Sequence, residues 1–316
     1  PAISARMAND IIPFENQFYL GMGGIRGNRA SAKLIEEADL IIALGTSLGF
    51  SFIGDFIKNK FKLIVVNIDD IIFNRSDLDI TFGLRTDLNL FLDAINSIAS
   101  KPNFKLWHQY CLKVKNNNPM VMESDKKDPI NSYYFIERIA ALTNSRHIIT
   151  NDAGSSNYIC SQAMTLNNGQ REITSGSFYT MGLTLPLAIG ASALEPSSQI
   201  IAITGDGSIE LNIQELQTIS IHNLNIKVFV INNGGYASIR DSQDAMCGSR
   251  YTDDSQILDF SKVADAFDIN YEIIKSVKTL DKKIKNVLSN DQPTLIEIIC
   301  DSKQYMIQPY QEDLFN

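Results

Sequence analysis

The chain has 316 residues, of which 44% are hydrophobic and 20% are charged, and these proportions are ordinary for folded globular proteins. They exclude a largely disordered chain, which has low hydrophobicity and high net charge. The formal net charge of −8 argues against a nucleic-acid-binding surface, because a phosphate backbone requires clustered lysine and arginine. Any anionic ligand must therefore be neutralised locally.

The spacing of the cysteines and the length of the apolar runs indicate the cellular compartment of the protein. Cys111, Cys160, Cys247 and Cys300 are far apart and form no CxxC pair, so neither a zinc site nor a disulfide framework is indicated. We therefore expect a reducing, cytoplasmic location. No apolar run approaches the roughly 18 residues that a membrane span needs, so no membrane partner is expected. The chain starts at Pro1 instead of methionine, which we interpret as a processed, trimmed or truncated N-terminus.

The first section alternates apolar, β-branched segments with helical stretches. Two of these segments, Asp39–Gly45 (DLIIALG) and Phe61–Asp69 (FKLIVVNID), are predicted strands. Continuous apolar strands separated by helices indicate a parallel sheet covered on both faces. We predict an α/β domain over residues 1–100 and a partly helical linker over residues 101–129, where lysine and asparagine cluster between prolines.

The alternation resumes over residues 130–316, which we predict to be a second α/β domain, so that the chain has two doubly wound parallel sheets. The expected helices cover Asn131–Thr143, Thr184–Leu194 and Leu211–His222. The expected strands cover His147–Thr150, Gln199–Thr204 and Ile226–Ile231, with two more near Tyr271 and Thr294.

Two predicted strands of the second domain run into glycine-rich turns. GDG (Gly205–Gly207) follows one strand, and NNGG (Asn232–Gly235) follows the next. The ends of parallel strands lie at the same edge of a sheet, where ligands bind, so Asp206 and Asn233 should project together. Carboxylate and amide oxygens suit Mg²⁺, which is often shared with a substrate phosphate.

The glycines of these turns indicate that a phosphate group binds next to the metal. Gly207 and Gly235 allow the backbone to approach a phosphate closely, and a helix beginning near Leu211 would direct its free N–H groups toward that anion. Metal and helix end together supply the local neutralisation that an acidic protein needs. A pair of merely structural turns is the alternative interpretation.

The stretch GDGSIELNIQELQTISIHNLNIKVFVINN, residues 205–233, resembles the diphosphate-anchoring motif of the thiamine diphosphate enzymes, which is GDG, a spacer of about 25 residues and NN. The resemblance implies thiamine diphosphate and Mg²⁺ as cofactors, with the metal held by Asp206, the Asn233 side chain and the Gly235 carbonyl. It also implies decarboxylation of a 2-oxo acid followed by carboligation to an acceptor.

Two further segments are similar to the same family. TNDAGSSNY (Thr150–Tyr158) resembles a strand-end loop whose backbone holds the diphosphate, and SGSFYTMGLTLPLAIGAS (Ser175–Ser192) resembles the segment at the aminopyrimidine. There the Tyr179 carbonyl and Met181 amide are expected to bond the ring, and the Met181 side chain to support the bent cofactor. An ordinary turn and core packing are the alternatives. The cofactor-binding residues implied by the resemblance are Gly154, Ser155, Ser156, Tyr179, Met181, Gly205, Asp206, Gly207, Ser208, Asn233, Gly235 and Tyr236.

The resemblance is to the acetolactate synthase branch and spans almost the whole chain. GMGGIRGNRASAKLIEEADLIIALGTSLG is similar to the Rossmann-like middle domain of that branch, and DQPTLIEIICDSKQYMIQP to its closing strand and tail. Some members carry FAD in the middle domain. GMGGIRG departs from GxGxxG because Arg26 occupies the place of the last glycine, so FAD is not supported.

The segment NNGGYASIRDSQ, Asn232–Gln243, departs from the branch at the acceptor pocket. Ser238 stands where that branch has methionine, and Ser242 stands where it has a pocket-shaping tryptophan. Loss of a large aromatic wall changes which second oxo acid or aldehyde could be held.

The largest departure is an absence. Family members carry an N-terminal pyrimidine-binding domain whose glutamate, supplied by a neighbouring subunit, activates the cofactor; here only Glu15 lies near the start, without a supporting motif. The catalytic group is therefore unknown in this chain. We expect an acetolactate synthase-like transferase or lyase that is oligomeric at full length and needs that domain for activity. The alternatives are a non-catalytic fragment or cofactor-binding half of a larger enzyme, and a nucleotide-binding module unrelated to thiamine.

Overall fold

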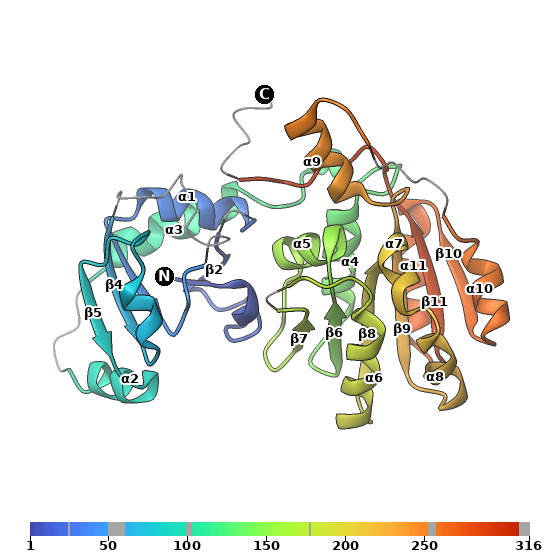
Figure 1. The fold of residues 1–316 in the computed structure, drawn as a ribbon, viewed down its shortest axis with the longest axis horizontal. Coiled ribbons are helices and arrows are strands. Elements are labelled where there is room, and N and C mark those ends of the chain that lie inside the picture. The colour runs from blue at the N-terminus through green and yellow to red at the C-terminus, as the bar shows by residue number, and fades with distance from the viewer. Residues whose placement is uncertain (25, 50–60, 99–102, 177, 252–256, 310–316) are drawn as a thin grey trace. The chain divides into compact units, whose positions relative to one another are not determined.

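The computed structural model describes residues 1–24, 26–49, 61–98, 103–176, 178–251 and 257–309, and the chain forms two compact units. Unit 1 comprises Pro1–Ala8 and Asn16–Pro119 with the C-terminal end from Ile307, and unit 2 comprises Asn9–Glu15 and Met120–Met306. Both units combine helices with parallel strands (Figure 1), which confirms the predicted α/β fold class. Within the described residues, no helix is long and apolar enough to cross a membrane.

Among its described residues, unit 1 contains two small parallel sheets. Strands β1 (Ala2–Ser4) and β2 (Tyr19–Met22) form one pair. The other sheet has the order β3-β4-β5 and consists of β3 (Leu40–Leu44), β4 (Lys62–Asn67) and β5 (Phe82–Arg85). The helices of this unit are α1 (Arg29–Glu37), α2 (Leu88–Asn96) and α3 (Lys105–Asn117), with short 3-10 turns at Arg6–Ala8 and Asp70–Asn74.

Helix α3 lies in the segment predicted to be a linker. It buries Cys111 and Val114 against Leu20 of β2 and Leu34 of α1, and burial of this apolar stripe stabilises the helix within unit 1. Unit 1 therefore extends to Pro119, beyond the expected end near residue 100. The boundary between residues 100 and 101, Ile25 of GMGGIRG and Ser177 of SGSFYTMG lie outside the described residues.

Unit 2 is built on a six-stranded sheet with the order β10-β11-β9-β8-β6-β7, in which every neighbouring pair is parallel. Figure 1 shows these strands side by side, with helices on both faces. The strands are β6 (His147–Asn151), β7 (Arg171–Thr174), β8 (Gln199–Gly205), β9 (Ile226–Asn232), β10 (Asn270–Ile274) and β11 (Thr294–Ile299). The helices are α4 (Ser132–Leu142), α5 (Gly154–Ala163), α6 (Thr184–Leu194), α7 (Asp206–Ile209), α8 (Glu215–Ile221), α9 (Ala237–Cys247), α10 (Phe260–Ala266) and α11 (Val277–Leu288), with 3-10 turns at Glu123–Asp125 and Glu210–Asn212.

Continuous apolar strands are buried on both faces of this sheet, as the sequence predicts. On one face, Ile200 of β8 and Val228 of β9 pack with Leu216 of α8, in a cluster to which α6 and α10 also contribute. On the other face, the ring of Phe229 lies 5.8 Å from that of Phe135 on α4. Because successive side chains of a strand point to opposite faces, the two layers of helices fix the register of the central strands and so fix where each strand ends.

The amino edge of the sheet holds a buried lysine. Lys227, the second residue of β9, is 0% exposed, and its ammonium donates to Asn290 Oδ1 (3.2 Å) and to the carbonyl of Gln292. Burial lowers the pKa of Lys227 from 10.5 to about 8, because removal from water disfavours the charged form. Gln199 at the start of β8 joins the same loop by donating to the carbonyl of Asn290 at 3.1 Å.

Candidate functional site

Three neighbouring strands of unit 2 end in polar turns at the carboxyl edge. Asp152 follows β6, Asp206 follows β8 and Asn233 follows β9. From β6 the chain passes to β7 on one side, whereas β8 and β9 lie on the other side, so the strand order reverses between β6 and β8. Open parallel sheets bind ligands at such a reversal.

The Asp206 carboxylate is enclosed by backbone amides. Its Oδ2 accepts hydrogen bonds from the N–H groups of Asn233 (3.1 Å), Gly234 (3.1 Å) and Gly235 (2.8 Å), and its Oδ1 accepts from Gly207 (2.8 Å). Gly234 and Gly235 have φ angles of +85° and +96°, which glycine adopts without strain. These angles turn successive N–H groups toward one oxygen, so the NNGG turn is folded around the aspartate of GDG.

Burial shifts the pKa of the Asp206 carboxyl group. The residue is 2% exposed, and burial raises the pKa of its carboxyl group although the backbone donors of Gly235, Gly207, Asn233 and Gly234 act to lower it. Desolvation therefore outweighs the hydrogen bonds. A cation placed at a remaining lone pair of the carboxylate would offset this cost, since an opposite charge favours the ionised form.

The two asparagines of the NNGG turn differ in their environments. The Asn232 amide donates to Glu297 Oε1 on β11 at 2.6 Å, and the other oxygen of Glu297 accepts from the Tyr271 hydroxyl. Asn233 is 7% exposed, and across the described residues its side-chain amide has no hydrogen-bond partner. Amides with so little exposure are usually bonded, so an amide without a partner among the described residues is a candidate ligand. Asn233 carries this amide on the turn whose backbone bonds Asp206, whereas the Asn232 amide is held by the sheet.

Asp152 is a site residue that the sequence analysis did not single out. It is 0% exposed and accepts from the backbone N–H of Ala153 (2.7 Å) and Thr184 (3.3 Å) and from the Ser208 hydroxyl (2.7 Å). Ser208 Oγ in turn accepts from the N–H of Gly182 at 3.0 Å. Asp152 thus connects the turn after β6, the start of α6 and the turn after β8. The available signal was its position at a strand end, the same as that of Asp206.

The segment before α6 holds Tyr179 and Met181 at this edge. Tyr179 has a φ of +48°, which is strained for a residue other than glycine, and its ring lies 6.0 Å from that of Tyr158 on α5. Gly182 has a φ of +82°, and its carbonyl accepts from Asn212 Nδ2 at 2.9 Å. The carbonyl of Tyr179 and the amide of Met181, predicted to bond the aminopyrimidine, therefore lie on a segment anchored at its end.

Two helices begin earlier than the sequence predicts. Gly154, Ser155 and Ser156, expected in a loop, form the first turn of α5, and no side chain caps that turn. The first backbone N–H groups of a helix have no partner within it, so they are donors for an anion at this edge. The helix expected from Leu211 is replaced by α7 from Asp206, a 3-10 turn and α8 from Glu215. The N-cap of α7 is Gly205, without a side-chain cap, and the Asp206 carboxylate accepts from the Gly207 N–H within the first turn.

Two glycines of GDG have different surroundings. A Cβ on Gly207 would lie 2.5 Å from Cε1 of Tyr236, whereas a Cβ on Gly205 would meet nothing within 4 Å. Gly207 is thus required by packing against the Tyr236 ring. The backbone at Gly205 borders open space, which a ligand could occupy.

The residues at this edge fit a magnesium–diphosphate group. Nowhere among the residues described do three histidine, cysteine, aspartate or glutamate side chains form a metal cluster, so a cation here would depend on the Asp206 carboxylate, the free Asn233 amide and a backbone carbonyl. Such oxygen ligands suit Mg²⁺, which commonly completes its shell with water and substrate phosphates.

Comparisons with known proteins identify the two parts of the chain. The model for "Thiamine pyrophosphate enzyme, C-terminal TPP binding domain" matches residues 152–298, and the model for "Thiamine pyrophosphate enzyme, central domain" matches residues 1–95. The chain belongs to the thiamine pyrophosphate enzymes. Thiamine pyrophosphate is the same molecule as thiamine diphosphate, and the match to the binding domain begins at Asp152 and includes Asp206 and Asn233.

Among curated proteins, this chain is similar to acetolactate synthase large subunits. It is 27% identical over 318 residues to that of Lactococcus lactis, which covers 97% of this chain and 54% of the relative. It is 27% identical to the isozyme 1 large subunit of Escherichia coli (96% and 54%), and 30% identical to the large subunit of Cyanidium caldarium (90% and 50%). The chain therefore spans about half the length of the curated relatives it matches.

Proposed function

We propose that this chain binds thiamine diphosphate through Mg²⁺ and forms the cofactor-binding part of an acetolactate synthase-like enzyme acting on 2-oxo acids. One observation carries the proposal: the Asp206 carboxylate is nested in the NNGG turn at the reversal of the sheet, and the side-chain amide of Asn233 in that turn has no hydrogen-bond partner among the described residues. The similarity to acetolactate synthase large subunits supports the substrate class.

In this proposal Asp206, the Asn233 side chain and the Gly235 carbonyl hold the metal. The first turn of α5, with Gly154, Ser155 and Ser156, directs its N–H groups at the diphosphate. The cofactor also contacts Gly205, Gly207 and Ser208 in the turn after β8 and Tyr236 in the turn after β9. The Tyr179 carbonyl and the Met181 amide bond the aminopyrimidine. Thiamine diphosphate, when bound, supplies the chemistry by accepting the electron pair released when a 2-oxo acid loses CO₂. The protein's share is to hold and orient it.

Further parts of the proposal rest on resemblance alone. We propose that the activating glutamate comes from protein outside this sequence and that the full-length enzyme is a cytoplasmic oligomer that carries out carboligation. Ser238 and Ser242 lie on α9, where Ser242 Oγ donates to the Ser238 carbonyl at 2.9 Å. We propose that these two small side chains widen the space for the acceptor.

The adjacent asparagines provide the test. Titration of the 316-residue chain with thiamine diphosphate, with and without Mg²⁺, should show metal-dependent binding, and Asn233→Ala should weaken that binding by at least about 10-fold. Asn232→Ala is the matched control, because it removes the bond to Glu297 and should lower the melting temperature more than the affinity. Equal affinities of Asn233→Ala and wild type would contradict the metal site.

Turnover separates the proposal from its alternatives. Binding of thiamine diphosphate without pyruvate decarboxylation by this chain alone would identify a cofactor-binding part that needs a further domain, whereas substantial turnover would exclude the fragment interpretation. A nucleotide-binding module would bind a nucleotide but not thiamine diphosphate, and Asp206→Ala would leave that nucleotide binding intact.

A further inference from the structure

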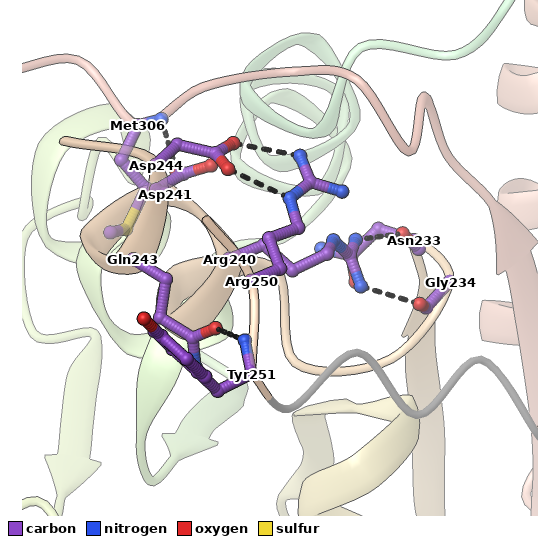
Figure 2. A network of polar contacts seen from close by, with 9 residues as sticks. All are labelled: Asn233, Gly234, Arg240, Asp241, Gln243, Asp244, Arg250, Tyr251 and Met306. Carbon is purple, nitrogen blue, oxygen red and sulfur yellow. Dashed lines mark hydrogen bonds and ion pairs between the residues drawn. The ribbon is translucent and has the colours of Figure 1, made fainter. Parts of the chain in front are cut away.

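Arg240 of α9 reaches back to the turn that precedes its own helix. Its Nη1 donates to the carbonyl of Gly234 at 2.5 Å, and its Nη2 donates to the carbonyl of Asn233 at 2.9 Å. Figure 2 shows the guanidinium facing both carbonyls. Arg240 is 5% exposed, so these bonds compensate a charge that has been removed from water.

The turn is therefore bonded from two sides. The N–H groups of Asn233, Gly234 and Gly235 converge on the Asp206 carboxylate, while two carbonyls of the same three residues are taken by Arg240. The third carbonyl, of Gly235, accepts from the Ala237 N–H at 2.8 Å and keeps a second lone pair, since a carbonyl oxygen has two. The planar guanidinium fork suits a pair of carbonyls, which a lysine ammonium cannot hold in the same fixed geometry.

We propose that Arg240 is a positioning residue for the metal: by holding the carbonyls of Asn233 and Gly234, it leaves the Gly235 carbonyl as the backbone oxygen presented to the cation. Arg240 touches neither metal nor cofactor in this arrangement and acts through the turn. The inference rests on the proposed function, because it assumes that a divalent cation binds at Asp206.

Metal selectivity distinguishes positioning from general support of the fold. Mg²⁺ requires near-ideal octahedral geometry at about 2.0–2.1 Å, whereas Ca²⁺ accepts longer and more irregular coordination. A turn that has lost its clamp should therefore disfavour Mg²⁺ more than Ca²⁺. Partial unfolding would weaken the binding of both ions to the same extent.

The experiment measures thiamine diphosphate binding to the full chain as a function of Mg²⁺ and, separately, Ca²⁺ concentration. For Arg240→Gln we expect the half-saturating Mg²⁺ concentration to rise about 10-fold and that of Ca²⁺ to rise less. Arg240→Lys, which keeps a cation near one carbonyl, should be intermediate. Arg250→Gln is the matched control, because it removes an arginine of the same region whose guanidinium pairs with the Asp244 carboxylate (Figure 2), with side chains 41% and 31% exposed.

Equal shifts for both ions, or no shift in either Arg240 variant, would overturn the inference. Thermal unfolding without ligand checks that the variants fold. If Arg240→Gln does not fold, the comparison of Arg240→Lys with wild type tests the inference. A wild-type chain that binds thiamine diphosphate independently of any metal would instead overturn the proposed function. The two failures are therefore distinguishable.

Discussion

The amino and carboxyl edges of the six-stranded sheet each bury an ionisable side chain. The amino edge buries a base that donates hydrogen bonds, whereas the carboxyl edge buries an acid that accepts them. At the amino edge the Lys227 ammonium donates to Asn290 and to the Gln292 carbonyl. At the carboxyl edge the Asp206 carboxylate accepts from the backbone of Gly207 and of the NNGG turn. Both groups have their pKa moved toward the neutral form by burial.

The difference lies in what each edge can bind in addition. An ammonium group has donors only, so it repels a second cation. The hydrogen bonds of Lys227 instead hold the segment of Asn290 and Gln292 against the sheet. A carboxylate retains lone pairs, and the turn that bonds Asp206 also carries the Asn233 amide, which has no partner in the part of the chain that the structure describes. We therefore propose the metal site at the carboxyl edge, where the buried group still has acceptor capacity, and not at the amino edge.

Removal of the carboxylate should give the largest effect. We expect Asp206→Ala to lower Mg²⁺-dependent thiamine diphosphate affinity by more than about 100-fold, beyond what supporting residues cost, because it removes the charged ligand. Isothermal titration with and without Mg²⁺ measures this. Lys227→Met, at the opposite edge, is the control and should leave the affinity unchanged; a comparable loss in both variants would break the comparison.

The buried lysine should instead appear in the pH dependence of stability. The folded-state pKa of Lys227, about 8, lies below the unfolded value of about 10.4, so between these values the unfolded chain binds more protons and stability rises with pH. The slope from this one group reaches at most about 1.4 kcal/mol per pH unit. Urea unfolding from pH 7.5 to 10.5 should show this rise in wild type and a smaller one in Lys227→Met; identical slopes would contradict the assignment.

The two glycines of GDG should give the smallest effects and sharpen the picture of the carboxyl edge. Gly207→Ala forces the Tyr236 ring to move, and we expect about 1–3 kcal/mol of lost stability, as for other overpacked sites, with weaker cofactor binding. Gly205→Ala meets open space and should leave the melting temperature unchanged while weakening thiamine diphosphate binding. Unaltered affinity in Gly205→Ala would place the diphosphate elsewhere.

Much of this architecture could be predicted from the sequence. Apolar, β-branched runs located β3, β4, β6, β8 and β9, because such runs are typical of strands in parallel sheets. In β3, however, Leu40, Ile42 and Leu44 are exposed, so only part of that run is buried. The spacing of GDG and NNGG then indicated that Asp206 and Asn233 follow neighbouring parallel strands. Helix α3 was harder, since its polar composition hides the two residues, Cys111 and Val114, that pack in unit 1.

The finer features depend on contacts between residues far apart in the sequence. Spacing does not tell Asn232 from Asn233, because only the neighbouring strand β11 brings Glu297 to the first of them. Asp152 could not be recognised as a connector, since its partners Thr184 and Ser208 come from other strand–helix units. The bonds of Arg240 could not be predicted either, because its two carbonyl partners belong to a turn whose fold depends on Asp206.

The reversal of strand order between β6 and β8 has a consequence for the order of events during folding. The polar turns at Asp152, Asp206 and Asn233 come from three separate stretches of chain, and parallel strands cannot pair until a crossover has been completed. Such non-local pairing is slow relative to helix formation. The binding surface therefore exists only after the central strands have assembled, so that competence for the cofactor is acquired late and reports on completion of the sheet.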